Sequence, residues 1–223
     1  KRDQSGTTAY SFDPLNRLTA IETPSSQISY SYDAFHRRME KTCNGSTERY
    51  LYLQDSEIAA YRDGSLRELR ILGEGIAEDI GSSVAFELEG KTVIPLHNSS
   101  GSVVLLLDKE GNPAASYRMT AFGEGDSKET LQPWIFSSKR FDPESGFYYF
   151  GRRYYSPSLG RFITPDPAGF QDGLNLYAYV HNNPLIHIDP DGQLAFLIPF
   201  AINIGVCYAM EMALPYAVTA LEA

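Results

Sequence analysis

Cysteine and histidine are scarce in this chain of 223 residues. The two cysteines, Cys43 and Cys207, form neither a disulfide framework nor a zinc-binding pattern, and either can serve as a small buried side chain. Among the four histidines, His181 and His187 lack further ligands at metal-binding spacing, which favours loop or core histidines. There is no glycine-rich phosphate loop, serine nucleophile elbow or paired-cysteine motif. The sequence therefore predicts neither a cofactor nor a metal site.

An excess of basic charge is also missing. The 19 Lys and Arg residues are outnumbered by 28 Asp and Glu residues, which gives a formal net charge of −9. Because the basic residues are scattered among acids, the electrostatic footprint of a nucleic-acid-binding protein is absent, and no nucleic-acid partner is predicted. The chain begins at Lys1 in mid-pattern, without an initiator methionine or the regions of a signal peptide, so we expect it to be a piece of a longer protein.

Aromatic residues and chain-breaking residues, by contrast, are abundant. The chain contains 15 Tyr, 12 Phe, 18 Gly and 13 Pro. Tyrosine and phenylalanine favour half-buried pleated surfaces, whereas glycine and proline divide a chain into short segments. This composition predicts an all-β protein.

A short unit recurs every 20 residues near the N-terminus. Its copies are Tyr10-Ser11-Phe12-Asp13 with Arg17, Tyr30-Ser31-Tyr32-Asp33 with Arg37, and a worn copy, Tyr50-Leu51-Tyr52, in which Leu53 replaces the aspartate. The spacing places two rings on one face of a strand and the aspartate in the following turn. Such a hairpin cannot bury its aromatic face alone, so successive units must stack into a continuous sheet. For the tyrosines, sheet packing is favoured over ligand stacking.

These units resemble the YD repeats of RHS proteins, large secreted or surface proteins of bacteria whose repeats coil into a hollow β shell. From Glu57 to Gly90, short apolar runs separated by glycines predict further hairpins. The sequence DKEGN, residues 108–112, predicts a turn between two strands. It lies in a segment, 100–123, that resembles the one preceding the core of RHS proteins, with Ser100 where leucine is usual.

The stretch from Lys139 to Asp191 is the most specific part of the sequence. Its short aromatic strands are punctuated by residue-proline pairs, which end a strand abruptly because proline fixes φ near −65°. About fifty consecutive residues here resemble the RHS-repeat-associated core. The resemblance includes two D-P-x-G motifs, at 166–169 and 189–192, whose aspartates are 23 residues apart.

The resemblance implies a chemical activity. In the family this core closes the end of the shell and resembles an intramolecular aspartic protease, which cuts the chain just after the second D-P-x-G and releases a downstream segment, often a toxin, inside the shell. Residue by residue, the catalytic aspartates fall on Asp166 and Asp189. The family arginine falls on Arg153, beside Arg152.

Paired carboxylates give this implication a chemical reason. Two carboxylates within about 3 Å cannot both stay ionised, so one keeps a proton and acts as acid while the other activates water. Arg153 would oppose that sharing, and we expect it to position the Asp189 loop or to polarise the scissile carbonyl. Gly169 and Gly192 allow the backbone to turn where a Cβ would obstruct the approach. The alternative is that both motifs are only turns, because aspartate is a common turn residue.

The scissile bond is expected at Gln193 and Leu194. Family members commonly place leucine directly after the second D-P-x-G and are cut behind it. Here Gln193 occupies that place and Leu194 follows. Cleavage is therefore expected to be either shifted by one residue or lost.

An apolar tail follows the second motif. Residues 194–210 are 17 residues without a charge, interrupted by a proline, an asparagine and a glycine. A membrane-spanning helix needs about 20 apolar residues, so the length is marginal. Two alternatives remain: a stretch packed inside the shell, which we favour, or a segment that contacts a membrane.

The sequence thus predicts an all-β fragment of a coiled antiparallel shell. We expect YD-type repeats at 1–55, a hairpin segment at 56–138, the RHS-associated core at 139–193 and an apolar, helical tail at 194–223. The predicted function is a self-cleaving shell of a secreted or cell-surface toxin system, whose partner is its own C-terminal segment or a fused toxin. Secretion-system or cell-surface proteins are further candidate partners. The alternative is a non-enzymatic shell or surface module that binds other molecules, such as carbohydrate.

Overall fold

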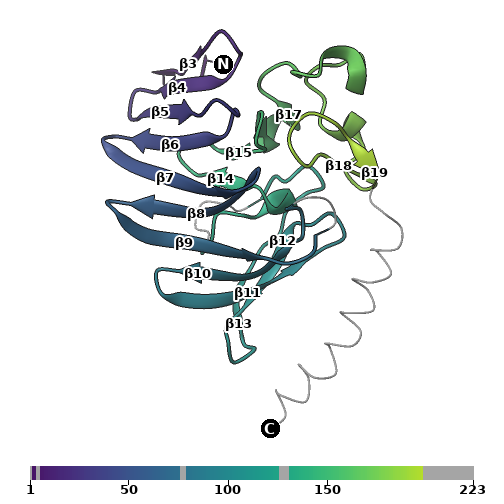
Figure 1. The fold of residues 1–223 in the computed structure, drawn as a ribbon. Coiled ribbons are helices and arrows are strands. Elements are labelled where there is room, and N and C mark those ends of the chain that lie inside the picture. The colour runs from purple at the N-terminus through teal and green to yellow at the C-terminus, as the bar shows by residue number, and fades with distance from the viewer. Residues whose placement is uncertain (1, 4–5, 76–78, 126–130, 198–223) are drawn as a thin grey trace.

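A meander of eleven antiparallel strands dominates the computed structural model, which describes residues 2–197 except 4–5, 76–78 and 126–130 (Figure 1). Each strand pairs with the next one along the chain. The strands are β3 (Ala9–Phe12), β4 (Leu18–Glu22), β5 (Gln27–Tyr32), β6 (Arg38–Cys43), β7 (Ser46–Leu53), β8 (Ser56–Arg62), β9 (Ser65–Leu72), β10 (Ser83–Leu88), β11 (Lys91–His97), β12 (Val103–Leu107) and β13 (Pro113–Ser116). The prediction of an all-β fold built of antiparallel hairpins is confirmed.

Smaller sheets and 3-10 turns make up the rest of the described chain. A four-stranded antiparallel sheet consists of β14 (Arg140–Asp142), β15 (Phe147–Tyr149), β16 (Tyr154–Ser156) and β17 (Arg161–Phe162). Two short hairpins are β1 (Arg2–Asp3) with β2 (Gly6–Thr7), and β18 (His187–Ile188) with β19 (Phe196–Leu197). The 3-10 turns are η1 (Phe136–Ser138), η2 (Pro157–Leu159), η3 (Gly169–Asp172) and η4 (Val180–Asn182).

The predicted helical tail falls almost entirely outside the described residues. Its first residues include the short strand β19, and residues 198–223 lie beyond the described part. Within the described part, no helix has the length and apolar character of a membrane span. The four domain boundaries stay a prediction, although the eleven-stranded sheet runs without interruption through the boundary expected at residue 55.

The aspartate of each YD unit closes its own turn. Asp13 Oδ1 accepts hydrogen bonds from the backbone N–H groups of Leu15, at 2.9 Å, and Arg17, at 3.0 Å. Asp13 Oδ2 accepts a further bond from Arg17 Nε at 2.7 Å. Asp33 makes the equivalent contacts in the next unit. The spacing of aspartate and arginine therefore follows from one turn, whose first residue caps the backbone and whose last residue neutralises the cap.

The arginine of each unit also joins that unit to the next. Arg17 Cζ lies 4.9 Å from the ring centroid of Tyr32, and Arg37 Cζ lies 5.4 Å from that of Tyr52. Arg17 Nη1 also donates to the carbonyl oxygen of Asp33 at 3.3 Å. The 20-residue period thus corresponds to one hairpin plus the reach of one arginine across the neighbouring strand.

The aromatic residues of a unit share one face of the sheet, as predicted. In β5, Tyr30 is buried and Tyr32 half-buried, whereas the intervening Ser31 is exposed. On the edge strand β3, Tyr10 and Phe12 remain 43% and 42% exposed. A central strand buries its rings against its neighbours and the core, and an edge strand cannot do so fully.

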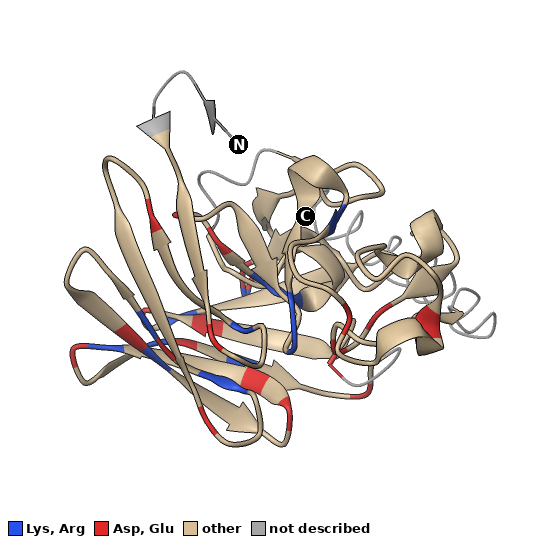
Figure 2. Ribbon diagram, turned by 90° about the horizontal axis from the view of Figure 1, so that it is seen from above, with Lys and Arg blue, Asp and Glu red and all other residues tan. Residues whose placement is uncertain are grey.

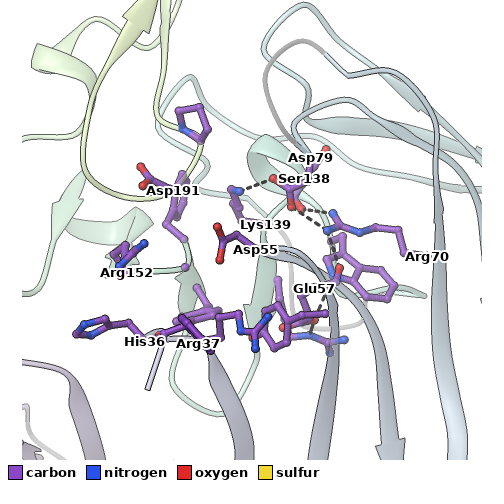
Figure 3. Close-up of a pocket in the computed structure, with 18 residues that line it drawn as sticks. His36, Arg37, Asp55, Glu57, Arg70, Asp79, Ser138, Lys139, Arg152 and Asp191 are labelled. Carbon is purple, nitrogen blue, oxygen red and sulfur yellow. Dashed lines mark hydrogen bonds and ion pairs between the residues drawn. The ribbon is translucent and has the colours of Figure 1, made fainter. Parts of the chain in front are cut away.

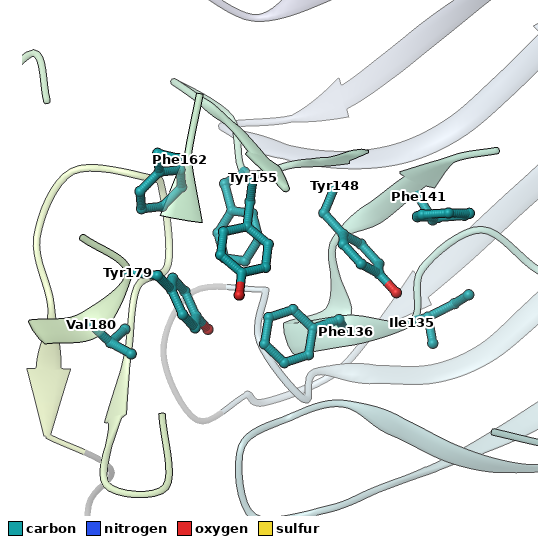
Figure 4. Close-up of a cluster of buried hydrophobic side chains, with 9 residues drawn as sticks. Ile135, Phe136, Phe141, Tyr148, Tyr155, Phe162, Tyr179 and Val180 are labelled. Atoms are coloured by element: carbon teal, nitrogen blue, oxygen red, sulfur yellow. The ribbon is translucent and has the colours of Figure 1, made fainter. Parts of the chain in front are cut away.

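The core segment packs on this aromatic face. Tyr30 and Tyr154 have ring centroids 5.2 Å apart, and Phe86 stacks on Trp134 at 5.4 Å. A third aromatic cluster lies within the core itself (Figure 4). Its buried members are Ile135, Phe136, Phe141, Tyr148, Phe150, Tyr155, Phe162, Tyr179 and Val180. The apolar packing therefore fixes the core both internally and against the sheet.

Buried ion pairs also join the sheet to the core. Arg38 on β6 and Asp142 on β14 are both 0% exposed, and Arg38 Nη1 lies 2.5 Å from Asp142 Oδ2. Arg140 likewise pairs with Glu57, and Lys139 with Asp79. Figure 2 shows basic and acidic positions side by side on neighbouring strands. Because an unpaired buried charge is costly, each of these side chains depends on its partner from the other layer.

Replacing Arg38 with methionine is expected to destabilise the fold strongly. The change leaves the Asp142 carboxylate buried, with only Lys41 Nζ nearby at 3.7 Å. Breaking one side of a buried pair costs about 3–5 kcal/mol of unfolding free energy. Urea unfolding followed by the fluorescence of the buried Trp134 measures this loss.

Arg49→Met provides the matched control. Arg49 pairs with Glu40 at 2.7 Å, but these side chains are 73% and 39% exposed. Exposed pairs contribute less than about 1 kcal/mol, so this variant should unfold near the parent midpoint. Equal losses in the two variants would show that the Arg38 pair does not hold the core to the sheet.

Candidate functional site

Arg153 is a buried cation held in one orientation. It precedes β16 and is 2% exposed, and its guanidinium carbon lies 3.7 Å from the centroid of the Phe162 ring. Its Nη1 donates to the carbonyl oxygen of Leu176 at 3.2 Å. An aromatic face and a backbone acceptor together leave the guanidinium little freedom to rotate.

The structure brings both predicted aspartates to this arginine. Arg153 Nη2 lies 2.6 Å from Asp166 Oδ2 and 3.5 Å from Asp189 Oδ2. Asp189 is 1% exposed and Asp166 is 8% exposed. Three charged side chains that are far apart in the sequence therefore meet in one buried site.

The arrangement differs from direct sharing of a proton between the two carboxylates. One nitrogen of Arg153 contacts both carboxylates, and no hydrogen bond joins Asp166 to Asp189. A guanidinium in this position offsets the repulsion that would otherwise force one carboxylate to take up a proton. The catalytic roles of the three residues stay a prediction.

The second D-P-x-G motif folds as a turn around the Asp189 side chain. Asp189 Oδ1 accepts hydrogen bonds from the backbone N–H groups of Gly192, at 2.7 Å, and Gln193, at 3.1 Å. Arg153 Nε donates to the carbonyl oxygen of Gly192 at 2.5 Å. This contact is one of the two roles predicted for Arg153, positioning of the Asp189 loop. The first motif forms a similar turn, in which Asp166 Oδ1 accepts a bond from Ala168 N–H at 2.8 Å.

Glycine is required at Gly192 for two reasons. Its φ is +80°, a value that side chains of L-residues rarely adopt. A Cβ there would also lie 3.3 Å from the backbone nitrogen of Arg153 and 3.3 Å from Cβ of Phe150. Gly169 shares the positive φ, +66°, but has open space around it. Close approach of the backbone to the arginine therefore concerns only the second motif.

Burial dominates the electrostatics of the site. It raises the pKa of Asp189 to about 7, and the nearby negative charge of Asp191 adds to the effect, while Arg153 and the backbone hydrogen bonds oppose it. Burial also raises the pKa of Asp166, against the hydrogen bond from Ala168 and the charge of Arg153. Burial lowers the pKa of Arg153 itself, against the two aspartates. Asp189 can thus hold a proton near neutral pH.

The predicted scissile residues lie at the edge of the site. Gln193 is half-buried, and Leu194 is 37% exposed. The backbone N–H of Ala195 donates to Asp172 Oδ1 at 3.1 Å, and β19 then pairs with β18. The chain on both sides of the expected cut is therefore fixed to the core, while the position of the cut stays a prediction.

Asp191 is a site residue that the sequence analysis did not single out. Its Oδ1 accepts a hydrogen bond from Gln193 N–H at 3.1 Å, and its carbonyl oxygen accepts one from Arg152 N–H at 3.0 Å. Its side chain also lines a small cavity of about 60 Å³ between the turn and the sheet, together with Asp55, Arg152 and others (Figure 3). The available signal was the second acidic residue of the DPDG sequence.

Comparisons with known proteins point to one family. The model of the family described as Teneurin YD-shell matches residues 2–185. The tRNA nuclease WapA of Bacillus subtilis is 29% identical over 219 residues, covering 92% of this chain and 9% of that protein. The probable deoxyribonuclease RhsA of Dickeya dadantii is 30% identical over 194 residues, covering 82% and 13%. The predicted resemblance to YD-repeat and RHS proteins is confirmed.

A solved structure shows the same fold. The Photorhabdus luminescens Tc holotoxin pore, determined with a substituted TccC3, superposes with a TM-score of 0.65 and 27% sequence identity. The match covers 85% of this chain and 10% of that chain. The present chain therefore spans about a tenth of the proteins that it resembles.

We expect one aspartate carboxyl group to titrate near neutral pH. Carbon-13 NMR of the side-chain carboxyl groups should show a resonance that takes up its proton as pH falls through about 7, and this resonance should vanish in Asp189→Asn. Because this pKa is raised in the folded state, stability is greatest below the usual aspartate value of 3.8 and declines as pH rises through about 7.

Asp108 is the internal reference for this titration. It caps an exposed turn with the same backbone contacts, and these hydrogen bonds, first those from Asn112, lower its pKa. If every aspartate titrates together with Asp108, burial does not control the charge of Asp189.

Proposed function

Because the chain belongs to the teneurin YD-shell family, we propose that it closes the end of a β shell that encloses a toxin and cuts its own chain beside the second D-P-x-G motif. Relatives named as nucleases and the likeness to a Tc holotoxin pore support a toxin system. The protein is secreted or lies at the cell surface, and its own C-terminal segment or a fused toxin is its partner inside the shell.

One observation carries the proposed cleavage: a buried guanidinium contacts two buried carboxylates and the backbone carbonyl of the turn between them and the tail. Hydrolysis of a peptide bond needs a polarised carbonyl, a base for water and an acid for the leaving nitrogen. Arg153 supplies the first of these. The two aspartates supply the others.

The environments of the aspartates assign their roles. Asp189, with a pKa of about 7, carries a proton at or below neutral pH and serves as the acid. Asp166 lies closer to Arg153, at 2.6 Å, and this contact favours its charged form, so it serves as the base for water. The two titrations are coupled through the shared arginine.

A non-enzymatic shell or interaction module is the second candidate. Asp166 and Asp189 each cap a turn through Oδ1, as Asp13 does in the YD repeat, where no catalysis is proposed. This observation favours a purely structural origin of the D-P-x-G motifs. In that case the buried charges only hold the end of the shell together.

Removing either acid should stop cleavage. The parent chain is expected to yield two fragments, whereas Asp166→Asn and Asp189→Asn should stay intact, or be cut at least about 100-fold more slowly, because general acid-base groups contribute about that factor or more. Intact-mass analysis over time measures the fraction cut. Asparagine retains a carbonyl oxygen that can cap the turn, so the change removes charge and leaves the fold.

Asp33→Asn is the matched control, because Asp33 also caps a turn and contacts an arginine. This variant should be cut at the parent rate. A parent chain that stays intact while folded favours the non-enzymatic candidate. Near-ultraviolet circular dichroism from the buried tyrosines establishes the folded state in each case.

A further inference from the structure

The peptide bond between Gly192 and Gln193 is held at both ends by charged groups. Its carbonyl oxygen accepts the hydrogen bond from Arg153 Nε, and its N–H lies 3.1 Å from Asp189 Oδ1 and 3.1 Å from Asp191 Oδ1. We propose that Gly192–Gln193 is the bond that is cut, and that Asp191 is a positioning residue at its nitrogen. This inference rests on the proposed self-cleavage, and it places the cut one residue earlier than the sequence predicts.

The carbonyl side of this bond is preorganised. Arg153 is fixed by the Phe162 ring, the Leu176 carbonyl and two carboxylates, so its Nε keeps one direction. When water adds to the Gly192 carbonyl carbon, negative charge develops on the oxygen that already faces the guanidinium. The missing Cβ of Gly192 permits this close approach.

The nitrogen side of the bond has an acid and a second carboxylate. Asp189 and Asp191 share the Gln193 N–H, which fixes the plane of the peptide bond relative to both side chains. The charge of Asp191 also keeps the neighbouring Asp189 protonated at a higher pH. Asp191 therefore acts through Asp189, and Asp189 gives its proton to the nitrogen as it leaves.

The next peptide bond has no such support among the described residues. No described residue donates a hydrogen bond to the Gln193 carbonyl oxygen, and the N–H of Leu194 has no described acceptor. The Leu194 side chain is 37% exposed. A bond without a polarised carbonyl lacks the electrostatic contribution on which such hydrolysis depends.

The reaction balances with water as the only co-reactant. Asp166 takes a proton from water, and the water oxygen forms a bond to the Gly192 carbonyl carbon. The bond from that carbon to the Gln193 nitrogen then breaks, and the nitrogen takes the proton of Asp189. The products are a carboxyl group on Gly192 and an amine on Gln193, and the proton on Asp166 returns the pair to its starting state.

Mass spectrometry of the 223-residue chain after incubation tests the position of the cut. The larger product should end at Gly192, and the smaller one should begin at Gln193 or at the pyroglutamate formed from it. A smaller product that begins at Leu194 or Ala195 overturns the inference and leaves self-cleavage standing. A folded chain that stays intact overturns both.

Asp191→Asn tests the role of Asp191, because asparagine can still accept the Gln193 N–H but carries no charge. Cleavage should slow at least about tenfold, as expected for losing one charge-assisted contact. The apparent pKa of the pH–rate profile should also move to lower pH, since the charge that favours protonated Asp189 is gone. A purely structural role would leave that pKa unchanged, and this outcome overturns the assignment.

Two further variants complete the test. Asp108→Asn changes an aspartate in an exposed turn with similar backbone contacts, and it should alter neither the rate nor the pH profile. Asp191→Glu restores the negative charge and should return the apparent pKa toward the parent value. Failure of glutamate to restore it would count against an electrostatic role.

Discussion

A buried guanidinium must find acceptors for its N–H groups, and this requirement organises the site around Arg153. Its acceptors are the carbonyl oxygens of Leu176 and Gly192 and the carboxylates of Asp166 and Asp189. None of them is close to Arg153 in the sequence. A single side chain therefore ties together both D-P-x-G turns and the segment between them, because an arginine left without partners in the core would be far more costly than the turns themselves.

The same requirement operates on a larger scale between the sheet and the core. The sheet face that receives the core carries Arg38, Glu57 and Arg70, which are all buried. Arg38 is surrounded by the rings of four tyrosines, two from the sheet and two from the core. Without the core this face would expose its aromatic rings and leave its charges unpaired. Closure of the shell end is thus specified by charge as well as by apolar packing.

The local parts of this fold could be predicted from sequence, because the interactions that form them lie within a few residues. Asp13 reaches Arg17 inside one turn, so the repeat carries its own structure and is visible as a pattern. The eleven-stranded meander follows because each hairpin pairs with the next. Contacts such as Arg38 with Asp142 could not be predicted, since 104 residues separate them and no periodic pattern links their positions.

The candidate site was predicted as a set of residues but not as a geometry. The two motifs and the arginine were recognisable, whereas sequence alone gives the charges of Asp166 and Asp189 and not the place of the cation between them. Asp191 was missed because its role depends on a backbone N–H, that of Gln193, and such a contact leaves no mark in residue spacing. Sequence patterns identify side chains that meet, and they are silent about side chains that meet the backbone.

Turn formation and catalysis are compatible roles for these aspartates, because each carboxylate has two oxygens with separate partners. In Asp166 and in Asp189, Oδ1 accepts backbone N–H groups of its own turn, while Oδ2 faces Arg153. The first contact makes the turn, and the second brings the charge into the buried site. A motif that begins as a structural turn needs only one added cation to bring two carboxylates together. The D-P-x-G motif thus carries the structure with one oxygen and leaves the other available for chemistry.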